Sequence, residues 1–255
     1  MGSDLSSISI ITAVYNNKDY IKSSLNSSIK QTGLSIDLIV IDGQSSDGSL
    51  GIIKGYKKFI TSLISEPDEG VYYALNKGVK NVRSPITGFL HSDDLFMNNI
   101  TLKKILKVFN TQDVDAVYGD LVYVDRFNPK KILRYWKSGE FKFKKLKYGW
   151  MPPHPTLFIR SDTFKKIGLF NTKYKISADY DFMLRLLTQK NIKVAYIPEV
   201  LVKMRVGGVS NRSLKNIIQK SREDYQIIKA NKIGGLGTLF LKNITKIPQF
   251  LHIQF

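Results

Sequence analysis

The sequence alternates between short, nearly continuous apolar runs and segments whose apolar residues recur at helical spacing. The first run, at 8–16, is rich in β-branched residues and predicts a buried strand. The next segment, 18–31, has Ile21, Leu25 and Ile29 at helical spacing and predicts a helix. Apolar strands separated by helices are typical of a parallel sheet covered by helices on both faces. Up to residue 119 the alternation predicts strands at 8–16, 36–43, 62–70, 86–90 and 114–119 and helices at 18–31, 48–58, 71–81 and 102–109.

Polar side chains follow each of the first four predicted strands. In a parallel α/β sheet, ligands bind beyond the carboxyl ends of the strands. Since these ends lie along one edge of the sheet, we expect their side chains to gather in a single polar, acidic crevice. The side chains concerned are Tyr15, Asn16, Asp42, Glu66, Asp68, Asp93 and Asp94.

The rest of the chain is more mixed in character. Residues 120–150 combine aromatic residues with lysines and predict hairpin-like strands and a short helix. Proline removes a hydrogen-bond donor from a strand, so a strand expected at 193–206 should be broken at Pro198. We further expect a strand within 152–160 and helices at 178–190 and 213–230.

The charge of the chain restricts its partners. Lys and Arg number 39 against 21 Asp and Glu, giving a formal net charge of +18. Such a charge predicts an anionic partner: nucleic acid, a phosphate-bearing ligand or an acidic membrane surface. The basic excess lies in 130–147 and 203–246, whereas the carboxylate clusters precede residue 126. The sequence has no cysteine, no apolar run of roughly 18 residues and no secretion signal, which permits a cytosolic location.

Each acidic candidate of the first half also has a plainer interpretation. Asp93 and Asp94 suit Mg²⁺ or Mn²⁺, which often bind through one or two carboxylates and substrate phosphates; alternatively, one of them caps a following helix. Asp42 either accepts hydrogen bonds from a base or ribose or forms an Asx turn before Gly43. Turn chemistry alone also explains Asp68.

Two candidates lie in the second half. Asp179 stands near a helix start and is either an acid favoured by the helix dipole or a general base, whereas Asp181 is expected to face away. His154, held between two prolines, is either a metal or phosphate contact or a structural histidine. The lysine-rich stretch 130–150 is interpreted as a solvated or membrane-facing surface rather than a nucleic-acid reader, although its interleaved aromatic residues fit base stacking as well as interfacial anchoring.

Taken together, these residues resemble the family-2 inverting glycosyltransferases of GT-A fold, in the subgroup that builds bacterial polysaccharides and O-antigens. The resemblance covers about residues 7–210, and its motifs follow the family's order. His91 stands where many members carry the first Asp of the Asp-x-Asp motif, and Ala178 replaces the Glu of a Glu-Asp pair. The matching segments are ISIITAVYNN, VIDGQSSDGS, EPDEGVYYALNKGV, GFLHSDDLF and SADYDFMLRL.

The resemblance implies a role for each candidate. Asp93 and Asp94 would bind Mg²⁺ or Mn²⁺ on the donor diphosphate, with His154 as a further metal candidate, and Asp179 would deprotonate the acceptor hydroxyl. Arg205 would close over the diphosphate from a flexible loop. The residues implied in nucleotide-sugar binding are Ala13, Tyr15, Asn16, Asp42, Asp68, Lys77, Asp93 and Arg205.

The implied fold is α/β of the GT-A type, with a Rossmann-like, mostly parallel nucleotide-binding sheet and helices on both faces. Residues 1–210 would form the glycosyltransferase domain, with 1–125 as its nucleotide-sugar half and 126–210 as its acceptor half. Residues 211–255 would be a basic, amphipathic helical extension that either lies on a bilayer or docks on the domain.

The implied activity is metal-assisted, inverting transfer of a sugar in surface polysaccharide biosynthesis. The expected donor is a UDP-, GDP- or dTDP-sugar, and the acceptor is a glycan or a polyprenyl-diphosphate-linked sugar. We expect the protein at the inner face of the cytoplasmic membrane as a peripheral protein, without a nucleic-acid partner. The alternatives are a sugar nucleotidylyltransferase, although the Gly-rich loop after the first strand is missing, and a basic nucleic-acid-binding protein, which leaves the carboxylates unexplained.

Overall fold

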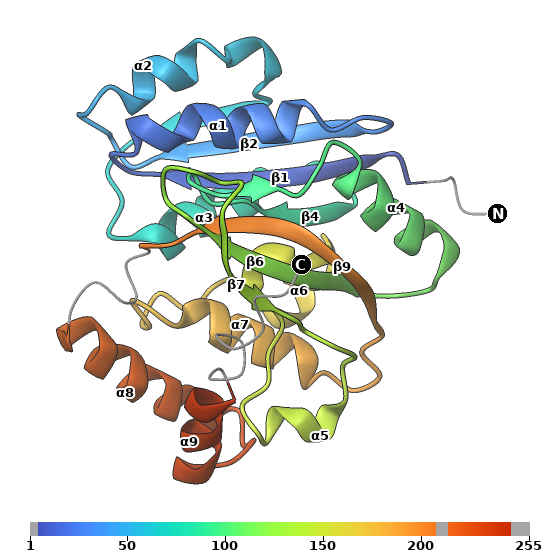
Figure 1. Ribbon diagram of the computed structural model, residues 1–255. Coiled ribbons are helices and arrows are strands. Elements are labelled where there is room, and N and C mark those ends of the chain that lie inside the picture. Colours follow the sequence, from blue (N-terminus) through green and yellow to red (C-terminus); the bar gives the residue numbers. More distant parts are fainter. Residues whose placement is uncertain (1–4, 208–213, 246–255) are drawn as a thin grey trace.

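The computed structural model describes residues 5–207 and 214–245, which form one twisted sheet with helices on both sides (Figure 1). The sheet has nine strands in the order β3-β2-β1-β4-β8-β6-β9-β5, and β7 pairs with β6. The strands are β1 Ser7–Val14, β2 Ser35–Asp42, β3 Ser62–Ser65, β4 Ile86–Phe89, β5 Leu95–Phe96, β6 Ala116–Val124, β7 Ile132–Trp136, β8 Phe158–Arg160 and β9 Val194–Arg205.

The first four strands are parallel, as the alternation predicts. β1 lies between β2 and β4, and β3 extends the sheet beyond β2. The remainder is mixed, because β8 runs antiparallel to both β4 and β6 while β9 runs parallel to β6. Among the described residues, the parallel arrangement is therefore confined to β3-β2-β1-β4 and to β6-β9, and the α/β class is confirmed with a mixed rather than mostly parallel sheet.

The alternation of side chains along β1 divides the core into two clusters. Ile8 and Ile10 pack on one face with residues of α1 and α4, whereas Ile11 and Ala13 pack on the other with residues of α3 and α7. This follows from the two-residue period of a strand. The helices are α1 Lys18–Ile29, α2 Ser49–Lys54, α3 Val71–Lys80, α4 Thr101–Thr111, α5 Phe143–Leu146, α6 Thr163–Ile167, α7 Ala178–Leu187, α8 Leu214–Ala230 and α9 Leu236–Ile244, with 3-10 turns at Lys57–Phe59 and His154–Thr156.

The break predicted at Pro198 is a local irregularity of β9. Gly119 of β6 pairs with Ile197 but the next residue, Asp120, pairs with Val200, so two residues of β9 are skipped in the register. A proline cannot donate to the ladder, and the bulge removes this residue from the pairing. β9 therefore continues as one strand past Pro198 and reaches the edge strand β5.

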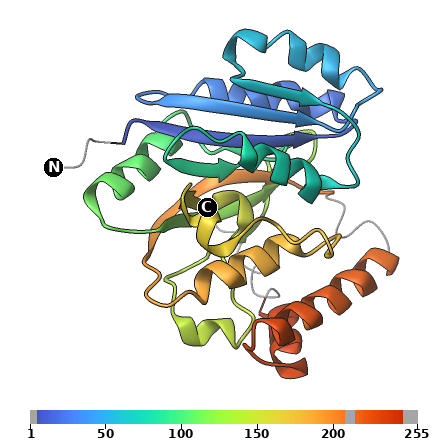
Figure 2. The same cartoon turned by 180° about the vertical axis from the view of Figure 1, so that it is seen from behind.

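Helices α8 and α9 lie together beyond α7, at the end of the molecule where α5 also lies (Figures 1 and 2). Ile217 and Ile218 of α8 are exposed, while Glu223 and Asp224 are buried. Backbone amides of 175–177 donate to Glu223, and Asp224 pairs with Lys220 of the same helix and Lys242 of α9. In the described part of the chain, no helix is both long and apolar enough to cross a bilayer.

Candidate active site

The loops after β1 and β2 are tied together by polar side chains. Asn16 adopts a left-handed conformation with φ of 47°. Its side-chain oxygen accepts a hydrogen bond from the Ser46 amide at 2.9 Å, and its own amide donates to Ser45 Oγ at 2.9 Å. Tyr15 extends outward and is 68% exposed, whereas Ala13 is buried in β1. Of this predicted group, Tyr15 and Asn16 are thus exposed and Ala13 is not.

Asp42, at the end of β2, is fully buried and accepts hydrogen bonds from inside the protein. The Ser45 amide donates to its carboxylate at 3.1 Å, and Ser65 Oγ donates at 2.7 Å. The first of these contacts is the Asx-type turn that the sequence allowed as the plainer interpretation. In this arrangement Asp42 shapes the loop that faces a ligand and joins it to β3.

Asp68 and Lys77 form an ion pair at the start of α3. Lys77 Nζ lies 2.8 Å from Asp68 Oδ1 and 2.5 Å from Glu66 Oε1. Hydrogen bonds with Asp68 and then Glu66 raise the pKa of Lys77. The Asp68 side chain is almost completely buried, so the ion pair holds the β3–α3 loop in place along the same edge of the sheet.

Asp93 and Asp94 occupy different environments although they are adjacent. Asp94 is buried: its Oδ1 accepts a long hydrogen bond from the Arg205 amide at 3.3 Å, and its Oδ2 has no hydrogen-bond partner among the described residues. Burial, and secondarily the charge of Asp93, raises the pKa of Asp94 well above its usual range. Asp93 keeps part of its surface exposed. Of the two, Asp93 is the carboxylate available to a cation.

Arg205, the last residue of β9, supports the turn that carries Asp93. Its guanidinium donates hydrogen bonds to the carbonyl oxygens of Asp93 and, at 3.1 Å, Arg126, and it lies over the ring of Tyr20 at 5.0 Å. The side chain is buried. The sequence suggested that Arg205 closes over a diphosphate from a flexible loop; here it is fixed at a strand end, and the residues at 208–213 lie outside the described ones.

Asp179 lies in the first turn of α7 and is only partly buried. The Tyr72 hydroxyl is 2.7 Å from the Ile176 carbonyl oxygen and 3.2 Å from Asp179 Oδ1. Burial and then the charge of Asp179 raise the pKa of Tyr72 well above its usual value, so this hydroxyl stays protonated and donates. Asp181 instead pairs with Arg185 at 2.8 Å, facing away as expected.

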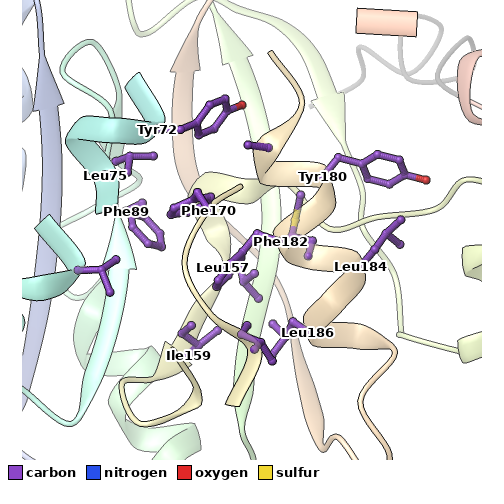
Figure 3. Close-up of a cluster of buried hydrophobic side chains, with 14 of the residues drawn as sticks. Tyr72, Leu75, Phe89, Leu157, Ile159, Phe170, Tyr180, Phe182, Leu184 and Leu186 are labelled. Carbon is purple, nitrogen blue, oxygen red and sulfur yellow. The ribbon is translucent and has the colours of Figure 1, made fainter. Parts of the chain in front are cut away.

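His154 is buried in an aromatic cluster between the sheet and α7. Its ring stacks on Phe89 at 5.1 Å and meets the edge of Phe170 at 5.6 Å, and Figure 3 shows these two phenylalanines side by side. Burial lowers the pKa of His154 to about 4 against the opposing charge of Asp179, so the ring is neutral. The ring of His91 lies 5.9 Å away. His154 therefore connects the Asp93 turn with the start of α7.

The acidic turn fits a divalent cation that brings most of its ligands with it. Within residues 5–207 and 214–245, no group of three or more histidines and carboxylates is arranged to hold a metal. Mg²⁺ and Mn²⁺ are commonly held by one or two carboxylates together with substrate phosphates. The partly exposed Asp93 is placed to meet such a cation from solvent, whereas His154 and Asp94 are buried.

Two positioning residues were not predicted from the sequence. Tyr72 stands within the quoted EPDEGVYYALNKGV segment, but helical spacing alone marks it as a core residue. Glu223 comes from α8 and accepts hydrogen bonds from the amides of Lys175 at 3.0 Å and of Ile176 and Ser177 at 2.9 Å. An acid surrounded by polar residues gives no sequence signal for such a distant role.

Comparison with known proteins agrees with this geometry. The model of Glycosyl transferase family 2 matches residues 9–168. An uncharacterized glycosyltransferase of Rickettsia typhi is 30% identical over 250 residues, covering 94% of this chain and 73% of the relative. A PGL/p-HBAD biosynthesis glycosyltransferase of Mycobacterium bovis is 27% identical, covering 80% of this chain and 78% of the relative.

Solved structures share the fold at low sequence identity. TarS of S. aureus, residues 1–349 in complex with UDP, has a TM-score of 0.64 at 20% identity. The match covers 87% of this chain and 65% of the TarS chain. The mannosyltransferase PcManGT of Pyrobaculum calidifontis, in complex with GDP-Man and Mn²⁺, has a TM-score of 0.66 at 16% identity. The match covers 96% of this chain and 72% of the PcManGT chain. When this chain is compared with a longer TarS chain, the match covers 43% of the TarS chain.

The fold is thus GT-A. The family model covers the strands that carry Asp42, Asp68 and Asp93, and the relatives extend the match to the helix that carries Asp179. The chain belongs to glycosyltransferase family 2.

Proposed function

We propose that the protein transfers a sugar from a UDP-, GDP- or dTDP-sugar to a hydroxyl of a glycan or a lipid-linked acceptor, with inversion at the anomeric carbon. One arrangement carries this proposal: the turn His154–Thr156 packs against both β4, which leads into the Asp93 turn, and α7, which begins with Asp179. The ring of His154 lies 5.9 Å from that of His91 in the Asp93 turn. A base and a diphosphate-binding turn side by side are the set that single displacement requires.

Asp179 would act as the general base. Single displacement needs one group that removes the acceptor hydroxyl proton while the oxygen attacks the anomeric carbon and the nucleoside diphosphate leaves. Asp179 Oδ1 accepts a hydrogen bond from the Tyr180 amide at 2.8 Å and shares the Tyr72 hydroxyl proton with the Ile176 carbonyl oxygen, which would leave the other carboxylate oxygen for the acceptor. Asp181 is not available for this role, since Arg185 neutralises it.

Asp93 would hold Mg²⁺ or Mn²⁺ against the diphosphate, and the cation would neutralise the negative charge of the leaving group. Arg205 would keep the turn in shape by binding its carbonyl oxygen. Tyr15 and the Asn16 loop would contact the nucleotide, with Asp42 and the Asp68–Lys77 pair supporting the surrounding loops.

The neighbours' ligands support a nucleotide-sugar donor. TarS structures contain UDP or UDP-GlcNAc, and the PcManGT structure contains GDP-Man and Mn²⁺. A role in bacterial surface polysaccharide assembly, including O-antigen, with the protein at the inner face of the cytoplasmic membrane, is part of the proposal. Family membership argues against the two alternatives, a nucleotidylyltransferase and a nucleic-acid-binding protein.

A donor screen followed by three variants tests the proposal. Melting-temperature shifts with UDP-, GDP- and dTDP-sugars, each with and without Mn²⁺, identify the donor. Asp179→Asn should keep the donor-induced shift and lose transfer, and Asp93→Asn should lose the Mn²⁺-dependent part of the shift. Asp113→Asn, at an exposed pair with Lys193, is the control. Full transfer by Asp179→Asn would refute the assigned base, and an unchanged Mn²⁺ response in Asp93→Asn would refute the assigned ligand.

A further inference from the structure

Helix α9 buries two polar side chains and leaves three apolar side chains exposed on one side, while Leu239 packs partly against the core. Lys242 is 2% exposed and Thr238 is also buried. Leu236, Phe240 and Ile244 are 70%, 63% and 40% exposed, and their spacing of four residues places them on one side of the helix. A helix that packs on a domain ordinarily buries its apolar side, so this orientation needs a cause.

Interactions of the buried lysine fix the orientation of α9. Lys242 Nζ lies 2.8 Å from Asp224 Oδ2 of α8 and 3.2 Å from the centre of the Tyr180 ring of α7. The backbone of α9 also touches Gly149, where an added Cβ would lie 2.3 Å from Lys242 Cβ. Rotation of the helix would leave Asp224 buried without this partner, which is costly. The outward position of the apolar side is therefore built into the fold.

The segment next to α9 continues the same type of surface. Phe143 and Tyr148 of the α5 region are 54% and 57% exposed, and lysines alternate with them. Gly149 links this region to α9, and both views show α5 and α9 at one end of the molecule (Figures 1 and 2). We call this surface the α5–α9 face, and it comprises Lys142, Phe143, Lys144, Lys147, Tyr148, Leu236, Phe240 and Ile244.

The charge around the α5–α9 face is almost entirely positive. Over 137–150 and 215–245, the described exposed acids are limited to Glu140, since Glu223 and Asp224 are buried. A second copy of the chain on this face would bring like charges together, whereas an anionic surface would complement them. The exposed basic residues are Lys137, Lys142, Lys144, Lys147, Lys215, Arg222, Lys229 and Lys232.

We propose that the α5–α9 face docks on an anionic lipid bilayer. Phe240, Leu236 and Phe143 enter the boundary between headgroups and acyl chains, while the lysines remain at the level of the lipid phosphates. α7, which carries Asp179, is packed directly against α8 and α9, so docking would bring the acceptor side of the site to the membrane. The advantage of bringing the site to the membrane rests on the proposed lipid-linked acceptor. The binding of the α5–α9 face to lipid does not depend on that acceptor.

Vesicle co-sedimentation of the full chain tests the docking without any activity measurement. The probes are vesicles of phosphatidylglycerol mixed with phosphatidylcholine, and vesicles of phosphatidylcholine alone. Phe240→Glu should weaken partition into the anionic vesicles by roughly tenfold or more, since a buried aromatic ring is lost and a charge enters the interface. Phe127→Glu is the matched control, because Phe127 is 85% exposed in the β6–β7 turn and outside the face.

A triple variant, Lys142→Gln with Lys144→Gln and Lys147→Gln, tests the electrostatic part. All three side chains are exposed, so folding should be unaffected, and partition into anionic vesicles should fall by on the order of a hundredfold at low salt. Equal binding of Phe240→Glu and the parent chain overturns the proposal. The proposal is also overturned if the parent chain is a dimer that Phe240→Glu dissociates. A melting temperature of Phe240→Glu several degrees below that of the parent chain without lipid overturns it too, since in both cases the face is covered by protein.

These outcomes separate the docking from the proposed reaction. Loss of transfer in Asp179→Asn with normal vesicle binding leaves both proposals standing. Normal transfer in Asp179→Asn refutes the assigned base and does not affect the docking. Vesicle binding that is indifferent to the α5–α9 face refutes the docking and leaves the reaction standing.

Discussion

Replacing Glu223 by alanine should loosen the segment that leads into α7, which carries the proposed base Asp179. The carboxylate is 2% exposed and accepts hydrogen bonds from three consecutive amides, those of Lys175, Ile176 and Ser177, at 2.9–3.0 Å. Gln219 Nε2 donates a fourth at 2.9 Å. Because the Ile176 carbonyl also receives the Tyr72 hydroxyl bond, the same segment positions the partner of Asp179.

The cost follows from the exposure of the three amides. The Ser177 residue is buried, so its unpaired amide should cost about 1–3 kcal/mol. Water reaches the other two more easily, and each should cost about 0.5–1.5 kcal/mol. The sum is about 2–6 kcal/mol, and at about 2–4 °C per kcal/mol for a chain of this size the melting temperature should fall by roughly 10 °C.

Urea unfolding and calorimetry measure this loss. Glu223→Gln keeps one acceptor oxygen and should lose about half as much stability, while Gln219→Ala removes only an exposed partner and should cost less than about 1 kcal/mol. In the folded Glu223→Gln variant, kcat should fall while the KM for the donor stays constant, since the donor contacts lie on other elements. A free energy of unfolding of Glu223→Ala within 1 kcal/mol of the parent chain would refute the reasoning.

Three further predictions concern buried groups. The charges and hydrogen bonds of Lys242 and Lys220 lower the pKa of Asp224 against the effect of burial. The charged Asp224 therefore stabilises the fold above its usual pKa of 3.8, and this contribution is lost as pH falls below it. Lys242→Met should therefore cost about 3–5 kcal/mol at neutral pH and less near pH 4, where Asp224 of the variant, buried without Lys242, takes up a proton, as urea unfolding at both pH values would measure. The pKa of His154 is lowered to about 4 from 6.5, so the folded state binds fewer protons than the unfolded state and stability should fall by up to about 3 kcal/mol as pH drops through this window. His154→Phe should lack that part of the pH dependence. Gly149→Ala, at φ of 75° and against the backbone of α9, should lower the melting temperature by several degrees more than Gly139→Ala, whose φ of 64° is similar but whose nearest atom is 3.9 Å away.

Local patterns were sufficient for most of the fold. Apolar runs and helical spacing predicted the first four strands and the helices between them within a few residues, because burial on both faces of a parallel sheet leaves a strong sequence signal. The predicted helix at 178–190 corresponds to α7, Ala178–Leu187. The mixed second half was less predictable, since β8 is only three residues long and owes its place between β4 and β6 to tertiary pairing.

Helical spacing does not predict the burial of residues whose partners are distant in the sequence. In α8 the apolar Ile217 and Ile218 are exposed, whereas ion pairing and backbone amides bury Glu223 and Asp224. The energy of a buried carboxylate depends on donors that other elements supply, and helical periodicity does not register them.

The sequence by itself determined the edge of the sheet at which the acidic residues gather, because the alternation of apolar strands and helices predicts parallel strands, whose carboxyl ends lie along one edge. The tertiary structure decided how the residues on that edge differ. It buries Asp94 and leaves Asp93 partly exposed, fixes Arg205 beneath the turn, and sets Asp179 against Tyr72. Charge, proton affinity and access depend on surroundings assembled from distant segments, and these exist only once the chain has folded.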